Sequence, residues 1–167
     1  PRPSVGKAHQ KPQANQPMNS KKHLFQLRPL ALFAGMLASL TTSSLLAQNA
    51  VPGTIEAETF NAMSGVQTEI CSEGGLNVSY IDTGDWMEYA INPVAAGAYT
   101  VDLRVACPSN GGTVRFMSGS TELGTLTIPV TGGWHTWTTI SSTLNLAAGN
   151  QTIRLEVVSG GWNFNWM

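Results

Sequence analysis

The sequence contains no lysine after Lys22 and no acidic residue before Glu56. Residues 1–47 carry six cations and no anion, whereas residues 48–167 carry three arginines against ten carboxylates, a formal charge of −7. The near-neutral charge of −1 for the whole chain therefore hides two unlike parts. An acidic part without lysine argues against nucleic acid as a partner.

Residues 18–47 have the layout of a secretory signal peptide. A positive segment from Met18 to Arg28 precedes a mostly apolar run, and Ala47 offers a small residue for cleavage. We therefore expect a secreted protein, extracellular or periplasmic, with a bacterial-type signal peptide and no membrane association after cleavage. The alternative is a membrane span, but hydroxyl residues interrupt the run and it is short for a bilayer. Residues 1–17 are polar and rich in Pro and Gln, which predicts disorder or an upstream translation artefact.

Cysteine is scarce, with Cys71 and Cys107 as the only two. In an exported chain this even number favours a disulfide between them, and the alternative is two buried free thiols. Because His135 is the only histidine after the expected cleavage site, a Cys/His metal site is not supported. The remaining residues, 48–167, fit one small domain.

No stretch after residue 50 has the apolar stripe of a helix, whereas period-two alternation recurs. Residues 99–105 and 153–157 alternate strictly between apolar and polar, and residues 134–140 are rich in Trp and Thr, as strands often are. Pro129 indicates a strand end or a sheet edge. Many short strands separated by Gly, Asn and Pro predict an all-β fold, a β-sandwich or jelly roll. Because Met167 falls inside an expected strand, we expect that the last strand is truncated and that the parent protein is longer.

Two carboxylates close to the start of this domain are candidate metal ligands. In Ile55-Glu56-Ala57-Glu58, alternation places Ile55 and Ala57 inward and both carboxylates on the other face. Neighbouring carboxylates suit a hard cation such as Ca²⁺. The alternative is a solvated strand face.

Aromatic residues beside amides suggest a sugar-binding surface. After Gly84, Met87 shares the expected core face with its alternating apolar neighbours, which leaves Trp86 on the outer surface, where a large aromatic calls for an explanation. An aromatic ring stacks on the apolar face of a sugar, while amides and carboxylates bind its hydroxyls. Tyr80, Trp134 and Asn163 would form such a set if their loops meet at one end of the sandwich. The alternative is that the tryptophans pack a small core.

With these residues identified, the chain resembles the family 6 carbohydrate-binding modules. The matching pieces run in order through almost all of residues 48–167, and together they are far more specific than any one alone. They are Ile55-Glu-Ala-Glu58, Met63-Ser-Gly-Val-Gln-Thr-Glu69, Gly74-Gly-Leu-Asn-Val-Ser-Tyr-Ile-Asp82, Gly84-Asp-Trp86, Leu103-Arg-Val-Ala106, Thr131-Gly-Gly-Trp-His-Thr-Trp-Thr-Thr139 and Gly160-Gly-Trp-Asn-Phe-Asn-Trp166.

The resemblance implies a jelly roll that binds polysaccharide or oligosaccharide without cleaving it, usually appended to a secreted glycoside hydrolase. It implies a main cleft formed by Tyr80, Trp134 and Asn163. It also implies a second cleft, used by some members, with Trp86 and Glu69. A structural Ca²⁺ held by Glu56 and Glu58 is implied as well, as is a catalytic domain in the parent chain.

The sequence departs from the family pattern at Ser79, which replaces the usual Gly before the tyrosine and is a small steric change in the main cleft. It also departs in the loop of residues 71–75, at the expected rim of that cleft. Two other functions stay open at this point. A small glycosidase needs two carboxylates about 5–9 Å apart on one cleft, and its candidates would be Asp82, Asp85, Glu88 and Glu69. Asp82 and Asp85 are better explained as turn caps. A structural or adhesion β-sandwich would instead present Trp86 to a protein partner.

Overall fold

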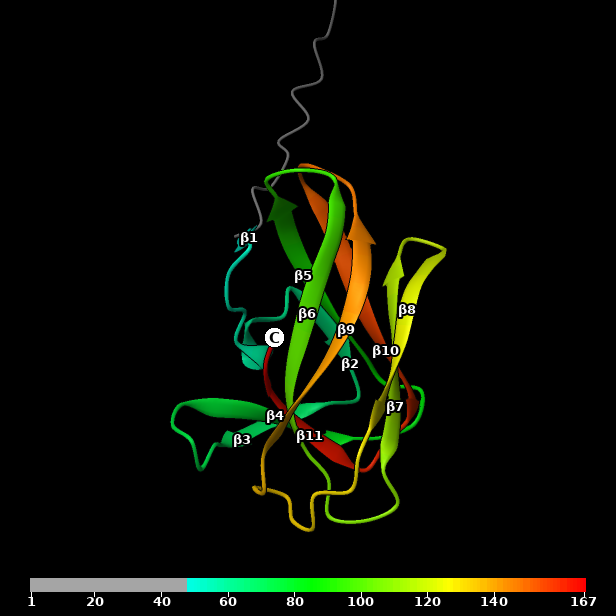
Figure 1. Ribbon diagram of the computed structural model, residues 1–167. Helices are drawn as coiled ribbons and strands as arrows, with labels where there is room; N and C mark the ends of the chain where they lie inside the picture. Colours follow the sequence, from blue (N-terminus) through cyan, green and yellow to red (C-terminus); the bar gives the residue numbers. More distant parts are fainter. Residues whose placement is uncertain (1–47) are drawn as a thin grey trace, which may run out of the picture. The chain divides into compact units, whose positions relative to one another are not determined.

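A computed structural model describes residues 48–167 of the chain. Within them lie eleven strands and one short 3-10 helix (Figure 1). The predicted signal peptide and the predicted disordered extension lie outside the described residues. The strands are β1 (Asn49–Val51), β2 (Ala62–Ser64), β3 (Gln67–Ile70), β4 (Leu76–Ile81), β5 (Trp86–Pro93), β6 (Gly97–Ala106), β7 (Gly112–Ser118), β8 (Thr121–Ile128), β9 (Thr138–Leu146), β10 (Gln151–Ser159) and β11 (Trp162–Trp166), and the helix is η1 (Ala57–Thr59).

The strands form two sheets that pack face to face. The six-stranded sheet has the order β1-β5-β10-β7-β8, with β2 also paired to β5, and the five-stranded sheet has the order β3-β4-β11-β6-β9. All pairs are antiparallel except β1 with β5. This confirms the predicted all-β sandwich.

The alternation in the sequence sets the core. On β5, Met87 and Tyr89 are fully buried, while Trp86 and Glu88 on the other face are half-buried. On β10, Leu155 is fully buried, as its alternation predicts. The inner faces of both sheets meet in one apolar cluster.

Two local expectations are corrected and a third is confirmed. Residues 134–137 are a loop, so β9 begins only at Thr138, because the Gly-Gly pair before Trp134 breaks the strand. Residues 57–59 form η1 and not a strand, although Ile55 and Ala57 point inward as predicted. β8 ends at Ile128 on the edge of its sheet, which agrees with the interpretation of Pro129.

The predicted disulfide is absent, because Cys71 and Cys107 are both buried free thiols. Cys71 follows β3 and Cys107 follows β6, and β4 and β11 lie between those strands in the sheet. Neighbouring strands are spaced by roughly 4.8 Å, so β3 and β6 lie about 14 Å apart. A disulfide requires Cα atoms within about 7 Å. The Cys107 thiol instead donates to the carbonyl oxygens of Ser109 and Gly161.

Candidate functional site

A cleft with two exposed aromatic side chains lies where β3, β4, β11 and the loop before β9 meet. It encloses about 360 Å³, a size within the usual range for small-molecule sites. We call it the aromatic cleft. Its lining residues are Glu69, Ser79, Tyr80, Trp134, His135 and Asn163.

Tyr80 reaches the cleft through an irregularity in β4. Against β11, the pairing moves from Ile81 opposite Trp162 to Val78 opposite Phe164, so β4 carries one extra residue there. Tyr80 adopts φ +52°, a left-handed conformation that is costly for a bulky side chain. Bulges of this kind turn a side chain away from its usual face. Tyr80 is therefore 63% exposed, although Ser79 next to it is buried.

Trp134 is presented by the loop between β8 and β9. The backbone N–H groups of Thr131 and Gly132 donate to the carbonyl of Cys107 at 2.7 and 3.1 Å, and Thr131 Oγ1 accepts from the Cys107 N–H at 2.8 Å. Gly132 adopts φ +89°, which favours glycine at this turn. The loop is thus anchored at its base while Trp134 stays half exposed at its tip.

Asn163 is buried and joins three parts of the cleft. Its Nδ2 donates to Glu69 Oε1 at 2.8 Å and to the backbone carbonyl of Trp134 at 3.0 Å. With both donors of the amide engaged, Oδ1 is the atom that can accept from a ligand. Asn77 Nδ2 also donates to Glu69 Oε1, at 3.3 Å, and His135 Nε2 lies 3.7 Å from the same oxygen.

Two buried polar atoms on β4, one of them from the lining residue Ser79, have no partner within residues 48–167. Ser79 Oγ and Asn77 Oδ1 are buried and make no hydrogen bond within the described residues. Buried polar atoms of native proteins normally have a partner. Ser79 belongs to the lining of the cleft, but its Oγ is enclosed by the protein and is not open to a ligand.

The structure brings together Tyr80, Trp134 and Asn163, as the resemblance implied, but it separates Glu69 from Trp86. Glu69 lies on β3 and lines the aromatic cleft, whereas Trp86 lies on β5 in the other sheet and lines a different hollow. The prediction of a second cleft that contains both Glu69 and Trp86 is therefore wrong. The reason is that Glu69 and Trp86 belong to different layers of the sandwich, which the sequence pattern does not reveal.

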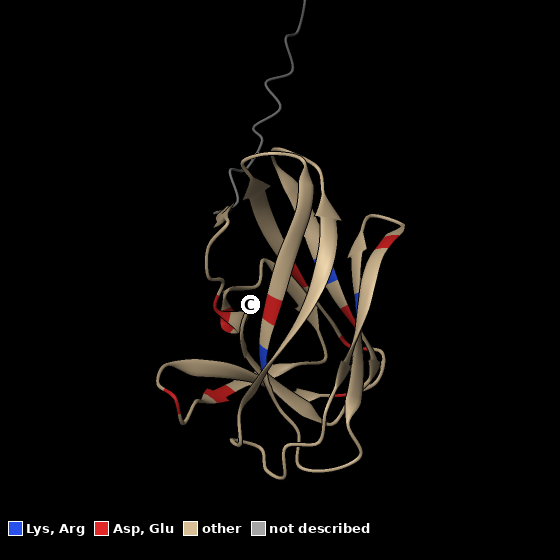
Figure 2. Ribbon diagram, in the orientation of Figure 1, with Lys and Arg blue, Asp and Glu red and all other residues tan. Residues whose placement is uncertain are grey.

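A charged side chain of the same molecule, Arg154, lies over the ring of Trp86. The Arg154 guanidinium lies 4.1 Å from the centre of its ring, and Arg154 Nε also donates to Glu88 at 2.8 Å. The Arg115–Glu156 pair is adjacent, at 2.7 Å. Figure 2 shows these blue positions on β10 and β7 beside red positions of neighbouring strands. This surface is a set of paired charges around the tryptophan.

One lining residue was missed from the sequence. His135 was considered only as a metal ligand, although it directly follows Trp134, and that adjacency is the signal that could have placed it in the cleft. Ser79 lines the cleft, as expected for a departure from the family pattern in the main cleft. The tryptophans divide as follows: Trp162 is fully buried, whereas Trp137 and Trp166 are only half-buried and Trp137 Nε1 donates to Ser72 Oγ.

The carboxylates do not form a catalytic pair. Asp85 Oδ2 accepts from the backbone N–H of Asp82 at 2.8 Å, which confirms that these residues cap a turn. Glu88 is paired with Arg154 in the other sheet. Glu69 is therefore the only carboxylate among the residues that line the aromatic cleft.

Glu56 and Glu58 fit a cation in one respect. Glu58 Oε2 is buried without a hydrogen-bond partner, and such a carboxylate oxygen suits Ca²⁺. No group of three or more His, Cys, Asp or Glu side chains within residues 48–167 is placed to hold a metal. Backbone carbonyls or water would therefore have to complete the coordination.

The same described part holds no helix of the length and hydrophobicity that a membrane span needs.

Comparison with known proteins agrees with this geometry. The sequence pattern of the family described as "Carbohydrate binding module (family 6)" matches residues 56–167. The C-terminal family 6 module of LamC, a laminarinase of Zobellia galactanivorans, is 47% identical with a TM-score of 0.66, over 68% of this chain and 94% of that one. A module of Cellvibrio mixtus lichenase 5A, in complex with cellotriose, is 44% identical with a TM-score of 0.65, over 68% and 92%.

A curated relative, the clotting factor G alpha subunit of Tachypleus tridentatus, is 40% identical over 68% of this chain but only 18% of its own length. The chain thus spans about a fifth of the curated relatives it matches first, at 18% and 23% of their lengths. The solved neighbours confirm the predicted jelly roll. The chain belongs to family 6 of the carbohydrate-binding modules, which bind carbohydrate without catalysing its cleavage.

Proposed function

We propose that the aromatic cleft binds a β-linked glucan by stacking a sugar ring between Tyr80 and Trp134. The observation that carries this proposal is the pair of exposed aromatic side chains, 63% and 50% accessible, lining one cleft above buried polar atoms. Exposed large aromatics in a concave site are costly unless a ligand covers them. A pyranose offers both an apolar face for the rings and hydroxyls for the floor.

The polar groups divide the hydrogen bonding between them. Asn163 Oδ1 and the Glu69 carboxylate, both in the lining of the cleft, accept from sugar hydroxyls. Because Asn163 is held by two hydrogen bonds before a ligand arrives, little ordering is needed on binding. His135 adds a ring nitrogen on the rim, near Glu69.

The choice of a glucan rests on the similar modules. At 47% and 44% identity, one belongs to a laminarinase and the other is bound to cellotriose. Flat β-linked glucose residues carry equatorial hydroxyls around an apolar ring face, which suits two aromatic walls with polar groups beneath.

The biological role that we propose is to hold a secreted carbohydrate-active enzyme on its substrate. Support comes from the relatives, which are much longer than this chain and include a β-agarase of Microbulbifer thermotolerans. The predicted signal peptide agrees with a polysaccharide ligand, because such polymers lie outside the cell. Glu56 and Glu58 would hold a structural Ca²⁺ that fastens the start of the domain near its last strand, where Glu56 pairs with Trp166.

Affinity electrophoresis tests this function. The 167-residue chain is run in gels that contain laminarin, barley β-glucan, xylan or agarose, with and without Ca²⁺, beside a Trp134→Ala variant. We expect retardation of the wild type by the glucans and clearly weaker retardation of the variant. The variant Trp86→Ala serves as the matched control, because it removes the same side chain outside the aromatic cleft. Retardation only by xylan or agarose would overturn the glucan choice, and a folded protein that binds none would favour the protein-adhesion function.

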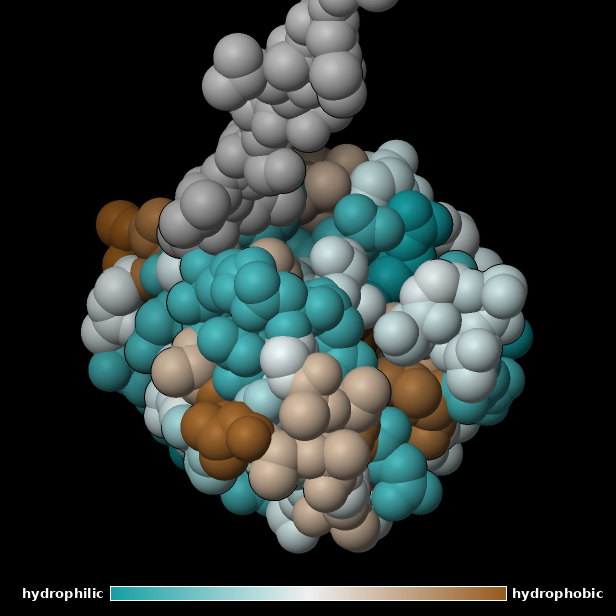
Figure 3. Space-filling model, turned by 90° about the horizontal axis from the view of Figure 1, so that it is seen from above, coloured by the Kyte–Doolittle hydropathy of each residue, from teal (hydrophilic) through white to brown (hydrophobic). Residues whose placement is uncertain are grey.

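Figure 3 bears on that alternative. On the face seen there, the hydrophobic side chains stand in separate groups between polar ones. A protein-binding surface usually has a contiguous apolar patch, and this face does not show one.

A further inference from the structure

Glu69 brings a negative charge into the aromatic cleft that neither lysine nor arginine neutralises. Residues 48–167 contain no lysine, and neither lysine nor arginine is among the residues that line the cleft. The three arginines of the same residues each form an ion pair with a glutamate outside it. These pairs are Arg104 with Glu73, Arg115 with Glu156, and Arg154 with Glu88.

The hydrogen bonds to Glu69 all reach one of its two carboxylate oxygens. Asn163 and Asn77 donate from Nδ2 to Oε1, at 2.8 and 3.3 Å. His135 Nε2 lies 3.7 Å from the same oxygen, which is beyond hydrogen-bond distance. Within residues 48–167 no side chain donates to Oε2, and the Glu69 side chain is 33% exposed. One oxygen is therefore held by the protein, while the other can accept from a ligand.

The carboxylate lies beside the aromatic walls of the cleft. Asn163 bridges Glu69 Oε1 and the backbone carbonyl of Trp134, so a single amide separates the negative charge from the residue that carries one wall. The faces of aromatic rings attract cations, and a hydrogen bond from a cation to a carboxylate is about twice as strong as one between neutral groups. This arrangement favours a sugar ring that carries a positive charge.

The hollow around Trp86 lacks this combination. Its lining residue Glu156 is paired with Arg115 at 2.7 Å, and the Arg154 guanidinium already lies over the tryptophan ring. Asp85, which also lines it, accepts from the backbone N–H of Asp82. A cationic ligand would have to displace a cation that the protein itself supplies.

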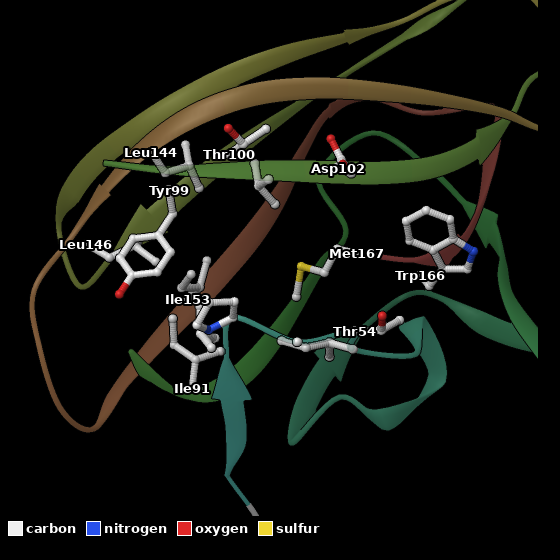
Figure 4. Close-up of a pocket in the computed structure, with 15 residues that line it drawn as sticks. Thr54, Ile91, Tyr99, Thr100, Asp102, Leu144, Leu146, Ile153, Trp166 and Met167 are labelled. Atoms are coloured by element: carbon white, nitrogen blue, oxygen red, sulfur yellow. The ribbon is translucent and has the colours of Figure 1, made fainter. Parts of the chain in front are cut away.

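A hollow between the two sheets lacks the combination for a different reason. It is lined by Asp102 and by the aromatic residues Tyr99 and Trp166, together with mainly aliphatic side chains (Figure 4). Asp102 Oδ1 accepts from Ser141 Oγ at 2.6 Å. Figure 4 shows Tyr99 and Trp166 at opposite ends of the hollow, so these rings do not face each other across one sugar.

We propose that the aromatic cleft prefers β-linked glucans whose rings carry a protonated amine, as in polymers of 2-amino-2-deoxyglucose, and that Glu69 Oε2 binds the ammonium group. This rests on the proposed function, because the ring must stack between Tyr80 and Trp134. A neutral glucan keeps the stacking and the hydroxyl contacts but lacks the ion pair. A polyanionic polysaccharide is repelled, because the lining offers it neither lysine nor arginine.

The charge of the whole described part acts in the same direction. Residues 48–167 carry three arginines against ten carboxylates, a formal charge of −7. Such a charge attracts a polycation over a longer range than the contact itself. Because salt screens this attraction, the preference for the amine is expected to be largest at low ionic strength.

Calorimetric titration of the full chain tests the proposal. Three soluble β-1,4-linked tetramers are compared at pH 6, where the amines are protonated: the glucosamine tetramer, its fully N-acetylated form, and cellotetraose. At low salt we expect the Kd of the glucosamine tetramer to be about fivefold or more below that of cellotetraose, as for a partly exposed ion pair. The N-acetylated tetramer should bind no better than cellotetraose, since acetylation removes the charge. This comparison needs no variant.

Two variants locate the effect. Glu69→Gln keeps an oxygen that can accept from Asn163 but removes the charge, so the ratio of the two Kd values should approach one. Glu122→Gln is the matched control, because it makes the same change in charge at an exposed position of β8 outside the cleft. That variant should keep the preference. An equal loss of preference in both variants would show that only the overall charge matters, and it would overturn the proposal.

The two levels of the account fail in different ways. If the wild type binds cellotetraose as tightly as the glucosamine tetramer, or more tightly, the preference for an amine is overturned while the proposed function stands. If the folded chain binds the N-acetylated tetramer as well as the glucosamine tetramer, the ion pair with Glu69 is overturned. If it binds none of the three tetramers and no laminari-oligosaccharide, the proposed function fails and the preference fails with it.

Discussion

Asn163 donates from Nδ2 to Glu69 Oε1 at 2.8 Å and thereby links the last described strand to the edge strand β3 across the floor of the aromatic cleft. The same nitrogen donates to the carbonyl of Trp134, which ties in the loop that carries the aromatic wall. One buried amide thus fixes the relative positions of two strands and a loop. We infer that the cleft is largely formed before a ligand binds.

Replacing Trp134 with Ala should weaken glucan binding without unfolding the protein. The side chain is half exposed, so little core packing is lost. Loss of a stacking aromatic costs about 1–3 kcal/mol in nucleobase recognition, which corresponds to roughly 5- to 150-fold in Kd at 25 °C. Calorimetric titration with a laminari-oligosaccharide measures the change. Equal affinities of wild type and variant would remove Trp134 from the site.

Replacing Asn163 with Asp should create a pH-dependent defect. Two carboxylates would then share the floor, and the repulsion raises the pKa of one of them in the folded state. Because the folded-state pKa lies above the unfolded one, the destabilisation is absent at low pH and grows as the pH rises above the unfolded value. Thermal melts at pH 4 and pH 7.5 should therefore differ more for the variant than for wild type. Adding Glu69→Gln should remove the extra pH dependence of the melting temperature. If the stability of Asn163→Asp depends on pH no more than that of wild type, the contact between residues 163 and 69 is contradicted.

Replacing Tyr80 with Gly should separate binding from stability. Glycine adopts the left-handed φ of +52° without strain, whereas an ordinary side chain there costs about 1–2 kcal/mol. We expect stability equal to or above that of wild type together with loss of glucan binding. Asn110→Gly is the matched control, because Asn110 also has a positive φ, +65°, and does not line the cleft. That variant should keep full binding, and a strongly destabilised Tyr80→Gly protein would refute the strain argument.

Stability should decline in acid partly through Glu73. The hydrogen bond from Arg104, with a further one from Asn165, lowers the pKa of Glu73 below its ordinary value of 4.5. A carboxyl with a depressed folded-state pKa contributes stability above its unfolded pKa and loses it as the pH falls through the folded pKa. Urea unfolding at pH 7 and pH 3 should therefore show a smaller pH dependence in Glu73→Gln. An unchanged dependence would show that Glu73 has no part in it.

Trp86→Ala should leave the affinity for a soluble glucan unchanged. Trp86 lies in the other sheet and its ring is covered by Arg154, which Glu88 holds in place. The measurement is the same titration as for Trp134→Ala. A comparable loss of glucan affinity in both variants would indicate a second sugar-binding surface around Trp86.

Much of the fold could be predicted from the sequence. Period-two alternation identified the core faces of β5, β6 and β10, because a side chain that alternates on a strand must choose one of two faces. The same rule could not separate Glu69 from Trp86. Alternation gives the face of each strand but not the sheet to which the strand belongs, and these two residues lie in different sheets.

The site was predicted only in part for a similar reason. Tyr80, Trp134 and Asn163 could be identified as candidate sugar ligands because they are aromatic or amide residues. The family resemblance then implied that they share one cleft. The bulge that turns Tyr80 outward depends on the register between β4 and β11, which is a long-range property. The error on Cys71 and Cys107 has the same origin, since an even count of cysteines carries no information on the two strands between them.

The most direct measurement is NMR mapping of a laminari-oligosaccharide on the full chain with assigned side-chain signals. The account predicts that the indole N–H of Trp134 and the side-chain amide of Asn163 shift on binding, while the indole N–H of Trp86 stays in place. Shifts confined to Trp86 and its neighbours, with Trp134 and Asn163 unmoved, would contradict the assignment of the aromatic cleft.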